Sequence, residues 1–560
     1  MPDNILICVA WPYANGSLHL GHLAGCYLPA DIFARYHRMK GNHVLMVSGS
    51  DQHGTPITLR AEQEGVAPES IVSKFHEEFL QSWDRMGISF DTFTTTGTDN
   101  HRETVHNIFL TLLDKGYIYT QETSLPYCHS CMRFLPDRYV LGTCPHCDNE
   151  DARGDQCDNC GRTLDPVDLI GMKCRLSGDR PEMRESEHFF LKLSAFQEPL
   201  LRWVTTQTHW RPNVLNFTKR FLEDGLHDRA ISRDLEWGIP LPVSGYLDKR
   251  IYVWFEAVIG YLSASKEWAL NLNATGTWES YWKEDTKSYY FIGKDNIPFH
   301  TIIWPAILMA YGGLNLPYDV PANEFLTLEG RQLSTSRNWA VWIPDYLDRY
   351  DPDPLRYYLS STMPETSDSD FSWQDFVRSN NDELVATYGN LVHRVLTFTY
   401  RNFDGKVPTP GTLDRETEEL FSVCAQLFEE AGSNISHCHF RAALNAGMSI
   451  ARHANRYLDI KEPWRTIKSD RQATATTLWA TVSVINCLKI VLYPFLPFSS
   501  EKLHSMLGFT YPLSDVGWSW EPSHKALPPG QGLSKPEPLY SKFDDQLVSE
   551  ELERLNQVSA

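Results

Sequence analysis

Two histidines stand close together near the start of the chain, in the segment PYANGSLHLGHLAG. His19 and His22 are three residues apart, so a helix would present them on one face. They follow a continuous apolar run at residues 5–11 and open the next helix, where free backbone N–H groups and the helix dipole attract anions. Gly21 would let a flat base approach the backbone. The pattern predicts a nucleotide site; the alternative is a pair of capping or surface histidines.

A second segment with phosphate-binding chemistry spans residues 328–337 and reads LEGRQLSTSR. Its glycine, serine and threonine residues are accompanied by Arg331 and Arg337. Hydroxyls, backbone amides and guanidinium groups can together wrap a polyphosphate. The alternative interpretation is an ordinary surface loop.

Seven of the twelve cysteines lie between Cys128 and Cys174, mostly in C-x-x-C pairs. Two such pairs separated by about ten residues are typical of a tetrahedral zinc site. The nearest complete quartet is Cys144, Cys147, Cys157 and Cys160. Four thiolates leave no open coordination position, so the predicted zinc is structural rather than catalytic. The clustering also favours a reducing compartment over a disulfide scaffold.

The elements that would position the histidines form a βαβ unit. Residues 5–11 predict a buried parallel strand, residues 20–39 a helix bent at Pro29 and ended by Gly41, and residues 43–49 a second strand. Such a unit favours a doubly wound α/β sheet. Further strands are predicted at 252–255, 289–293 and 325–328.

The rest of the chain changes character twice. Residues 119–186 carry the cysteines together with many Gly, Pro and Asp, which predicts a small insertion held by metal. From about Ser379 onward, apolar residues recur at i, i+3 and i+4 over long segments, which predicts an α-helical domain. A final acidic amphipathic helix is predicted from Lys542.

Composition limits the class of protein. Of 560 residues, 42% are hydrophobic and 22% charged, which argues against a disordered or collagen-like chain. The N-terminus lacks the basic segment and apolar core of a signal peptide. The most apolar stretch, 478–498, is interrupted by polar residues and Pro494, so it predicts a buried helix rather than a membrane span. We therefore expect a cytoplasmic protein without membrane contact.

The net charge of −20 argues against a surface coated by nucleic acid, because phosphate binding uses clustered Lys and Arg. It does not exclude a local basic track. Arg394, Arg452 and Arg456 are the residues that could form one. Binding through so few cations would be modest and strongly sensitive to salt.

The two phosphate-binding segments together resemble the signature elements of class I aminoacyl-tRNA synthetases. AWPYANGSLHLGH and SGSDQHGTPI resemble the methionyl-tRNA synthetase family in particular. The likeness continues in the family's order through YVWFEAVIGYLSA, FIGKDNIPFH, GNLVHR and EPW, and thus covers most of the chain. It implies a Rossmann-type parallel sheet interrupted by a zinc-ribbon connective insertion and followed by an α-helical bundle that binds the anticodon.

The resemblance also implies a division of the chain. The catalytic sheet domain would span 1–117 and 249–322, the connective insertion 118–248, a signature-loop and stem-contact region 323–378, the anticodon-binding domain 379–540 and a C-terminal acidic helix 541–560.

The activity implied is ATP-dependent ligation of L-methionine to tRNA(Met) through methionyl-adenylate, with Mg²⁺ accompanying ATP. His19 and His22 would be the main hydrogen-bond donors to the reacting phosphate. The other residues implied to contact ATP are Gly21, Gly293, Asp295 and Thr335.

One segment departs from the family. Its phosphate loop is usually Lys-x-Ser-Lys-Ser, but residues 332–336 of this chain read QLSTS, so both lysines are absent. Ser334 and Thr335 would still contact phosphate. We expect Lys294, Arg331 or Arg337 to supply the missing positive charge, and we expect alanine at either arginine to slow adenylate formation.

A methionine site requires a carboxylate for the ammonium group and an apolar cavity for the thioether. Asp51 follows the second strand, where ligands of open α/β sheets bind, and matches the family's ammonium ligand; the alternative is a turn residue. Aromatic residues suit a polarizable sulfur, although at helical spacing they are also typical of a core. The residues that match the family's pocket are Trp11, Tyr13, Trp254, Ala257, Tyr261, Phe299 and His300.

The remaining cysteines, Cys128, Cys131 and Cys174, match the second zinc site of those family members that carry two. The fourth position is Ser177, and serine is a poor zinc ligand. We expect either a second zinc with an irregular fourth ligand, such as His129, or an empty outer site.

Three residues of the helical region match the family's anticodon contacts. Asn390 and Arg394 share a helix face at i, i+4, and Trp464 follows Pro463. Unpaired bases are recognised by stacking on aromatic rings and by hydrogen bonds to their edges. The alternatives are a core anchor for Trp464 and a solvated surface for Arg441, Arg452 and Arg456.

Three other functions share part of this pattern. A class I synthetase for leucine, isoleucine or valine would need a large editing insertion. A small-molecule nucleotidyltransferase would not need a helical domain with a stacking tryptophan. A zinc-ribbon RNA-binding protein without activity would not need Asp51. The chain shows no appended dimerisation module, so we expect a monomer.

Overall fold

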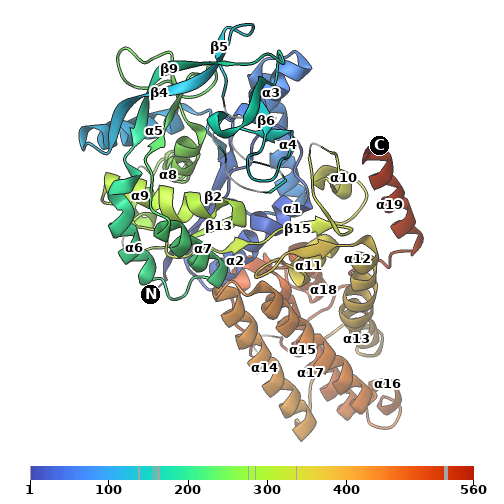
Figure 1. The fold of residues 1–560 in the computed structure, drawn as a ribbon. Helices are drawn as coiled ribbons and strands as arrows, with labels where there is room; N and C mark the ends of the chain where they lie inside the picture. The colour runs from blue at the N-terminus through green and yellow to red at the C-terminus, as the bar shows by residue number, and fades with distance from the viewer. Residues whose placement is uncertain are drawn as a thin grey trace.

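Five parallel strands between residues 4 and 323 organise the first part of the chain, in the order β14-β13-β1-β2-β3 (Figure 1). Their bounds are Asn4–Val9 for β1, His43–Ser50 for β2, Thr92–Thr95 for β3, Lys287–Gly293 for β13 and Ala322–Asn323 for β14. The strand order reverses between β1 and β13, which lie side by side in parallel. The predicted doubly wound sheet is confirmed.

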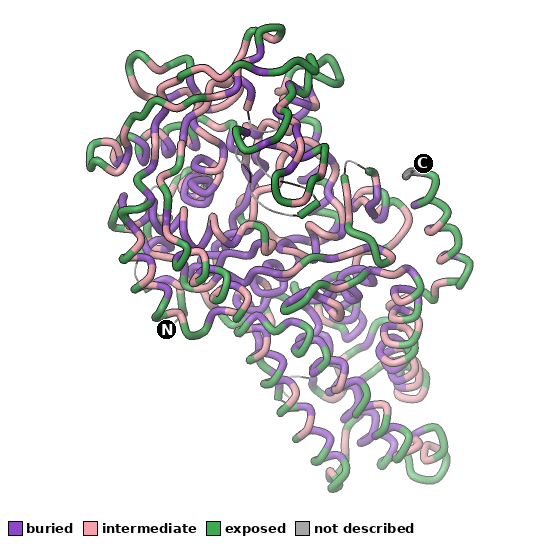
Figure 2. The backbone as a smooth tube through the Cα atoms, viewed as in Figure 1, coloured by how far each residue is buried: buried purple, intermediate pink, exposed green. Residues whose placement is uncertain are grey.

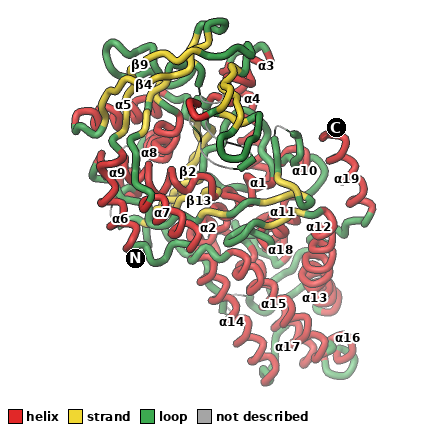
Figure 3. The backbone as a smooth tube through the Cα atoms, in the orientation of Figure 1, coloured by secondary structure: helices red, strands yellow, loops and turns green. Residues whose placement is uncertain are grey.

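The computed structural model describes residues 2–136, 139–154, 157, 159–160, 164, 166–274, 276–283, 285–335, 337–521 and 527–559. Within these residues the strands gather in the N-terminal part, and an elongated bundle of helices extends from it (Figure 3). The N-terminal part therefore contains the predicted sheet, and the C-terminal part contains the predicted α-helical domain.

The strands of the sheet are apolar on both faces because each face is covered by helices. Ile5, Ile7 and Val9 pack into one core, and the alternating Leu6 and Cys8 pack into the other. This is why the sequence of β1 is a continuous apolar run. The covering helices are α3 (Thr55–Glu64), α4 (Pro68–Met86), α5 (Asp99–Asp114), α8 (Val253–Asn271) and α9 (Trp304–Tyr311), together with the helix that follows β1.

The helix predicted at residues 20–39 is present in three connected parts. They are α1 (Leu20–His22), the π-helical turn η1 (Leu23–Tyr27) and α2 (Leu28–Met39). Pro29 is the second residue of α2, just after the wide turn, and because proline has no N–H it cannot continue the regular hydrogen-bond ladder. Gly41 follows the helix with φ of 81°, the left-handed conformation expected after a helix end.

The strand predicted at Tyr252–Phe255 is wrong, because α8 begins at Val253. A short apolar run cannot distinguish a strand from a buried helix, and here apolar residues continue for several turns on nearly every side of the helix. The strand predicted at 325–328 exists as β15 (Leu326–Leu328) but belongs to a separate sheet with β16 (Arg331–Gln332) and β17 (Ser369–Phe371).

The predicted insertion lies between the two halves of the parallel sheet. Its main feature is the long antiparallel pair β4 (Ile118–Cys128) and β9 (Glu182–Leu191). The cysteines lie at the end of this pair and on a small sheet beside it. The other elements are β5 (Arg133–Phe134), β6 (Val140–Thr143), β7 (Ala152–Arg153), β8 (Ile170–Cys174), α6 (Gln197–Thr205), α7 (Pro212–Glu223), β10 (Arg229–Ala230), β11 (Ser232–Arg233) and β12 (Arg250–Ile251).

The C-terminal part is helical, as predicted. It comprises α10 (Ile343–Leu347), α11 (Pro352–Ser361), α12 (Trp373–Ser379), the π-helical η8 (Asn380–Gly389), α13 (Asn390–Asn402), α14 (Arg415–Ser436), α15 (Phe440–Lys461), α16 (Pro463–Thr466), α17 (Arg471–Leu492), α18 (Pro497–Met506) and α19 (Gln546–Ser559). The helix α17 is long and apolar enough to cross a membrane, but its apolar window is fully buried inside the protein (Figure 2). It is the buried helix that the sequence predicts.

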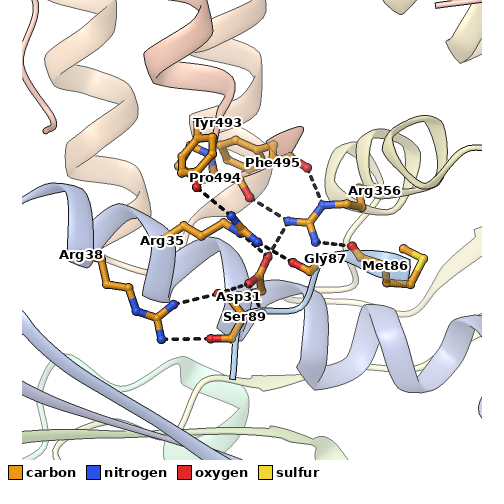
Figure 4. A network of polar contacts seen from close by, with 10 residues as sticks. All are labelled: Asp31, Arg35, Arg38, Met86, Gly87, Ser89, Arg356, Tyr493, Pro494 and Phe495. Carbon is orange, nitrogen blue, oxygen red and sulfur yellow. Dashed lines mark hydrogen bonds and ion pairs between the residues drawn. The ribbon is translucent and has the colours of Figure 1, made fainter. Parts of the chain in front are cut away.

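A buried ion cluster joins the sheet to the helical part (Figure 4). Arg356 on α11 has no exposed surface and donates to Asp31 of α2 at 2.6 Å. It also donates to the carbonyls of Phe495, Pro494 and Met86. Burial opposes ionisation of Asp31, but Arg35 and Arg356 overcome this and hold its pKa at about 2. One side chain thus links three segments that are distant in the sequence.

Candidate active site

The two histidines form a closed pair at the start of α1. The Nδ1 atom of His19 accepts from Gly21 N at 3.1 Å, and the Nδ1 atom of His22 accepts from His19 N at 3.1 Å. A nitrogen that accepts a hydrogen bond carries no proton, so both neutral rings have their hydrogen on Nε2. The histidines therefore do cap the helix start, but only through their Nδ1 atoms. Both Nε2–H groups remain available as hydrogen-bond donors.

Both histidines are neutral at pH 7. Burial lowers the pKa of His22 to about 4, and burial followed by the neighbouring His22 lowers the pKa of His19 well below its ordinary value. Their ring centroids are 4.0 Å apart. A site of this kind offers hydrogen-bond donors without a full positive charge.

The segment 326–335, which we call the signature hairpin, lies against the histidine turn. Glu329 and Gly330 have φ of 50° and 72°, and they form the tight turn between β15 and β16. A side-chain carbon placed on Gly21 would lie 2.8 Å from Leu333 Cδ1. The two predicted phosphate segments are therefore neighbours, and a base can reach Gly21 only if Leu333 moves aside. Ser336 lies outside the described residues.

The residues predicted to meet ATP on the other side follow β13. Gly293, Lys294 and Asp295 lie at the carboxyl end of that strand, beside the end of β1. A side-chain carbon on Gly293 would lie 2.8 Å from a carboxylate oxygen of Asp295, so a larger residue there would displace that carboxylate. The histidines and this segment thus flank the point where the strand order reverses, which is where open α/β sheets bind ligands.

Lys294 is held by two carboxylates. Its Nζ atom donates to Glu324 at 2.8 Å and to Asp368 at 2.7 Å. Burial alone would lower the pKa of Lys294, but the hydrogen bonds to Asp368 and Glu324 raise it. Its charge is therefore already compensated.

Asp51 lies at the carboxyl end of β2 and is only 3% exposed. Its backbone pairs with Tyr13, so the ends of β1 and β2 meet here. Burial and the neighbouring Glu256 raise the pKa of the Asp51 carboxyl to about 8. A cation that binds beside it would replace the lost solvation and keep it ionised.

Aromatic side chains gather near the ends of β1 and β2, where the backbone of Tyr13 pairs with Asp51. Trp254 donates through Nε1 to the Tyr13 hydroxyl at 3.2 Å, and its ring centroid is 4.6 Å from that of Phe299. The Tyr261 hydroxyl bonds to His300 Nε2 at 2.7 Å, and His300 Nδ1 donates to Asn296 O. Ala257 lies on α8 between Trp254 and Tyr261. The structure therefore brings these predicted pocket residues together from the segment after β1, from α8 and from the π-helical residues Phe299–Ile303 beyond β13.

Trp11 fits this pocket because glycines face it on two sides. A side chain on Gly49 of β2 would meet the Trp11 ring at 2.3 Å, and one on Gly260 of α8 would meet it at 2.7 Å. The indole thus fills the space between sheet and helix.

Four residues near the pocket were missed from the sequence. His53 donates to Glu256 at 2.5 Å, and His101 lies 3.5 Å from the same carboxylate oxygen. Arg233 stacks on Tyr252 at 3.8 Å and lines the opening beside Tyr13 and Trp254. His53 stands within the SGSDQHGT loop and Glu256 between two predicted pocket residues, so both could have been found there. Only the fold brings Arg233 and His101 to the site.

The quartet Cys144, Cys147, Cys157 and Cys160 has its four sulfur atoms within 4.8 Å of one another. Cys144 and Cys160 are 3.9 Å apart, and Cys147 and Cys157 are 3.6 Å apart. Sulfur atoms at about 2.3 Å from a tetrahedral zinc are separated by about 3.8 Å. None of the twelve cysteines forms a disulfide. The donor set fits one zinc ion.

The outer cysteines also converge. Cys131 and Cys174 have sulfur atoms 3.8 Å apart, and the Ser177 hydroxyl lies 3.4 Å from the Cys128 sulfur. His129 instead pairs through Nε2 with Glu182. The structure thus places Ser177, and not His129, beside the three cysteines as the fourth side chain of the set.

Two of the three predicted anticodon residues, Arg394 and Trp464, line a second pocket in the helical part. The guanidinium of Arg394 lies 5.3 Å from the Trp464 ring centroid, and its Nη2 donates to Asn455. Trp464 is 37% exposed, so it is not a core anchor. Asn390 is exposed at the start of α13. Arg441, Arg452 and Arg456 are exposed on α15.

Comparison with known families covers both parts of the chain. Residues 5–396 match the family model of class I tRNA synthetases (M), and residues 407–559 match the anticodon binding domain of methionyl tRNA ligase. The methionine–tRNA ligase of Dehalococcoides mccartyi is 58% identical over 99% of this chain and 100% of its own length. This chain belongs to the methionine–tRNA ligase family.

Other members of the family agree with this assignment. The methionine–tRNA ligase of Thermomicrobium roseum is 55% identical, with 99% of each chain covered. The solved structure of Mycobacterium tuberculosis methionyl-tRNA synthetase in complex with methionyl-adenylate superposes with a TM-score of 0.80 at 25% identity, over 96% of this chain and 99% of that chain. Family membership confirms the resemblance stated from the sequence and excludes the three alternatives.

Proposed function

We propose that this chain joins L-methionine to tRNA(Met) in two steps at one site. The observation that carries the proposal is the meeting of three features at the carboxyl ends of β1, β2 and β13. They are the neutral histidine pair, the signature hairpin lying against it, and a buried carboxylate in an aromatic pocket. Together they provide for a nucleotide, its polyphosphate and an amino acid.

In the first step the methionine carboxylate attacks the α-phosphorus of ATP in line. A carboxylate O–P bond forms, the bond to the bridging oxygen breaks, and pyrophosphate leaves. The two Nε2–H groups of His19 and His22 donate to the phosphate oxygens as charge develops on them. Mg²⁺ bound to ATP would neutralise part of the phosphate charge. In the second step the 2′-hydroxyl of the terminal adenosine of tRNA takes the methionyl group and AMP leaves.

The pocket suits methionine because it combines the buried Asp51 carboxylate with aromatic side chains. Asp51 would bind the α-ammonium group. Tyr261 and His300 satisfy each other's hydrogen bonds, and burial lowers the pKa of His300 to about 4, so this pair carries no charge. Trp11, Trp254 and Phe299 offer aromatic edges to the sulfur.

The proposal includes zinc bound by both cysteine sets. We expect metal analysis of the purified chain to find two zinc ions, one bound by the quartet and one, more weakly, by Cys128, Cys131, Cys174 and the Ser177 hydroxyl. Brief chelation should remove the outer zinc first. One zinc per chain before chelation, or equal loss from both sites, would contradict the second site. The matched variant is Ser177→Cys, which should make the outer zinc resist chelation.

The helical pocket supports recognition of the anticodon. Changing Trp464 to alanine should lower kcat/KM for charging of tRNA by about 10- to 100-fold, because stacking of one base contributes about 1–3 kcal/mol. ATP–pyrophosphate exchange, which needs no tRNA, should remain unchanged. Equal losses in both assays would contradict this role. Tyr400→Ala, at an exposed aromatic residue on the same helix as Arg394, serves as the control.

The proposal also retains several expectations from the sequence. They are the domain boundaries at residues 117, 248, 322, 378 and 540, a monomeric state and a cytoplasmic location. The direct test of the function is charging of a tRNA(Met) transcript with labelled methionine by the purified chain. Failure to charge that transcript while zinc and fold are intact would refute the proposal.

A further inference from the structure

The signature hairpin of this chain lacks both lysines of its family's pattern. Of the three cations expected to replace them, two already contact other side chains in the structure and are less available to phosphate. Lys294 is bound by Glu324 and Asp368. The guanidinium of Arg331 lies over the Trp339 ring, 4.8 Å from its centroid. Arg337 is exposed beyond Thr335. Another positive charge is therefore needed on the side of the hairpin that faces the histidine turn.

Arg60 on α3 lies on that side, at the turn that precedes the histidine pair. Its Nη1 atom donates to the carbonyl of Asn15 at 2.5 Å, in the turn that leads to the histidine pair. A side-chain carbon placed on Gly16 would lie 3.5 Å from Arg60 Nη1 and 3.6 Å from Thr335 Cγ2. Arg60 and Thr335 therefore approach the same glycine. Thr335 occupies the position of the family's second lysine.

The Arg60 side chain is held in place and still has donors to offer. Its Nε atom pairs with Glu64 at 2.6 Å, and its guanidinium lies over the Phe75 ring at 4.7 Å. In the described part of the chain, Nη2 has no hydrogen-bond partner. The Arg60 side chain is 34% exposed, so a ligand can reach it. A guanidinium keeps its charge at all relevant pH values and binds phosphate oxygens through two parallel hydrogen bonds.

We propose that Arg60 supplies the positive charge that binds the β- and γ-phosphates of ATP and stabilises the departing pyrophosphate, in place of the lysines missing from the signature hairpin. The inference rests on the proposed function, because it concerns the first of the two steps. No further reactant is needed: Arg60 remains protonated throughout, and the only bonds that change are those at the α-phosphorus.

The test compares Arg60→Ala, Arg60→Lys and Glu64→Gln in ATP–pyrophosphate exchange with methionine. Arg60→Ala should lower the exchange rate about 100-fold, the size of effect seen when one preorganised donor to a developing charge is removed. It should also raise the KM for pyrophosphate, while calorimetric binding of methionine without nucleotide stays unchanged. Arg60→Lys should recover at least about tenfold of the loss, because it restores the charge without the fork of donors. Glu64→Gln removes the same ion pair but keeps the cation, so it should stay within about twofold of the original rate.

Each outcome bears on the inference. An Arg60→Ala rate within about threefold of the original, a loss matched by Glu64→Gln, or a larger loss in Arg331→Ala or Arg337→Ala would overturn it. If a slow variant still binds methionine, it is folded. If Arg60→Ala disturbs the turn at Asn15, Arg60→Lys still tests whether the positive charge is what matters. If the unmodified chain shows no exchange with methionine, the proposed function fails. If it exchanges normally and Arg60→Ala does as well, only the role of Arg60 fails.

Discussion

Replacing Asp51 by asparagine is expected to lower kcat/KM for methionine by two to three orders of magnitude in the activation step. Asp51 is 3% exposed and directly follows β2, so in the proposed site the amide would leave the ammonium of methionine without its counter-charge. Removing one partner of a buried charge pair costs about 2–5 kcal/mol, and about 1.4 kcal/mol corresponds to a factor of ten. The measurement is ATP–pyrophosphate exchange as a function of methionine concentration.

The control for this substitution is Asp99→Asn. Asp99 is an exposed carboxylate in the first turn of α5, after the neighbouring strand β3. It changes the net charge equally but should leave methionine activation within about twofold. A similar loss in both variants, or no loss in Asp51→Asn, would show that the ammonium binds elsewhere.

The same carboxylate predicts the pH dependence of methionine binding. Burial and Glu256 raise the pKa of Asp51 to about 8, whereas the ammonium group requires the ionised form. Below that pH the site must first lose a proton. The affinity for methionine should therefore rise by up to about tenfold per pH unit as the pH increases toward about 8, and then level off. Calorimetric titration between about pH 6 and 8 measures this slope. A flat profile in the original chain, or the same slope in Asp51→Asn, would contradict it.

Replacing Arg356 by methionine is expected to destabilise the fold by about 3–5 kcal/mol. The variant leaves Asp31 buried with one cation fewer, and it removes the donor that serves the carbonyls of Phe495, Pro494 and Met86 (Figure 4). Buried acceptors without a donor are costly. The first transition in urea-induced unfolding should shift to a lower concentration, because this cluster joins the sheet to the helical part.

Arg38→Met is the matched control. Arg38 lies on the same helix as Asp31, but its partner Asp91 and its own side chain are both 29% exposed. Exposed pairs contribute about 0–1 kcal/mol, so this variant should unfold almost as the original chain does. If Arg356→Met is no more destabilising than Arg38→Met, the cluster does not hold the two parts together.

Much of the fold follows from local patterns. The apolar runs of β1, β2 and β13 predict buried strands because their faces are covered on both sides, and the helix over residues 20–39 ends at Gly41 as expected. The same reasoning gives a wrong strand at Tyr252–Phe255. A short apolar run indicates only that a segment is buried, and the apolar residues that continue through Leu262 are what identify α8.

The site was predicted less completely, because its chemistry depends on side chains that only tertiary packing brings together. The motifs identify His19, His22 and Asp51, but they do not show that capping bonds place the histidine protons on Nε2. Arg60 has only a helical pair with Glu64 in its local sequence, and its approach to Gly16 depends on how α3 packs. Likewise, Lys294 was expected to serve phosphate, yet Asp368 from a distant segment binds it.

The pocket around Asp51 and the histidine pair should activate methionine and no other amino acid. ATP–pyrophosphate exchange with the purified chain, measured separately with each of the twenty amino acids, tests this most directly. We predict rapid exchange with methionine and at least about 100-fold lower kcat/KM with each of the others, since aromatic side chains favour an unbranched thioether over a charged, strongly polar or branched side chain. Faster exchange with leucine, isoleucine or valine, or no exchange with any amino acid, would contradict the account.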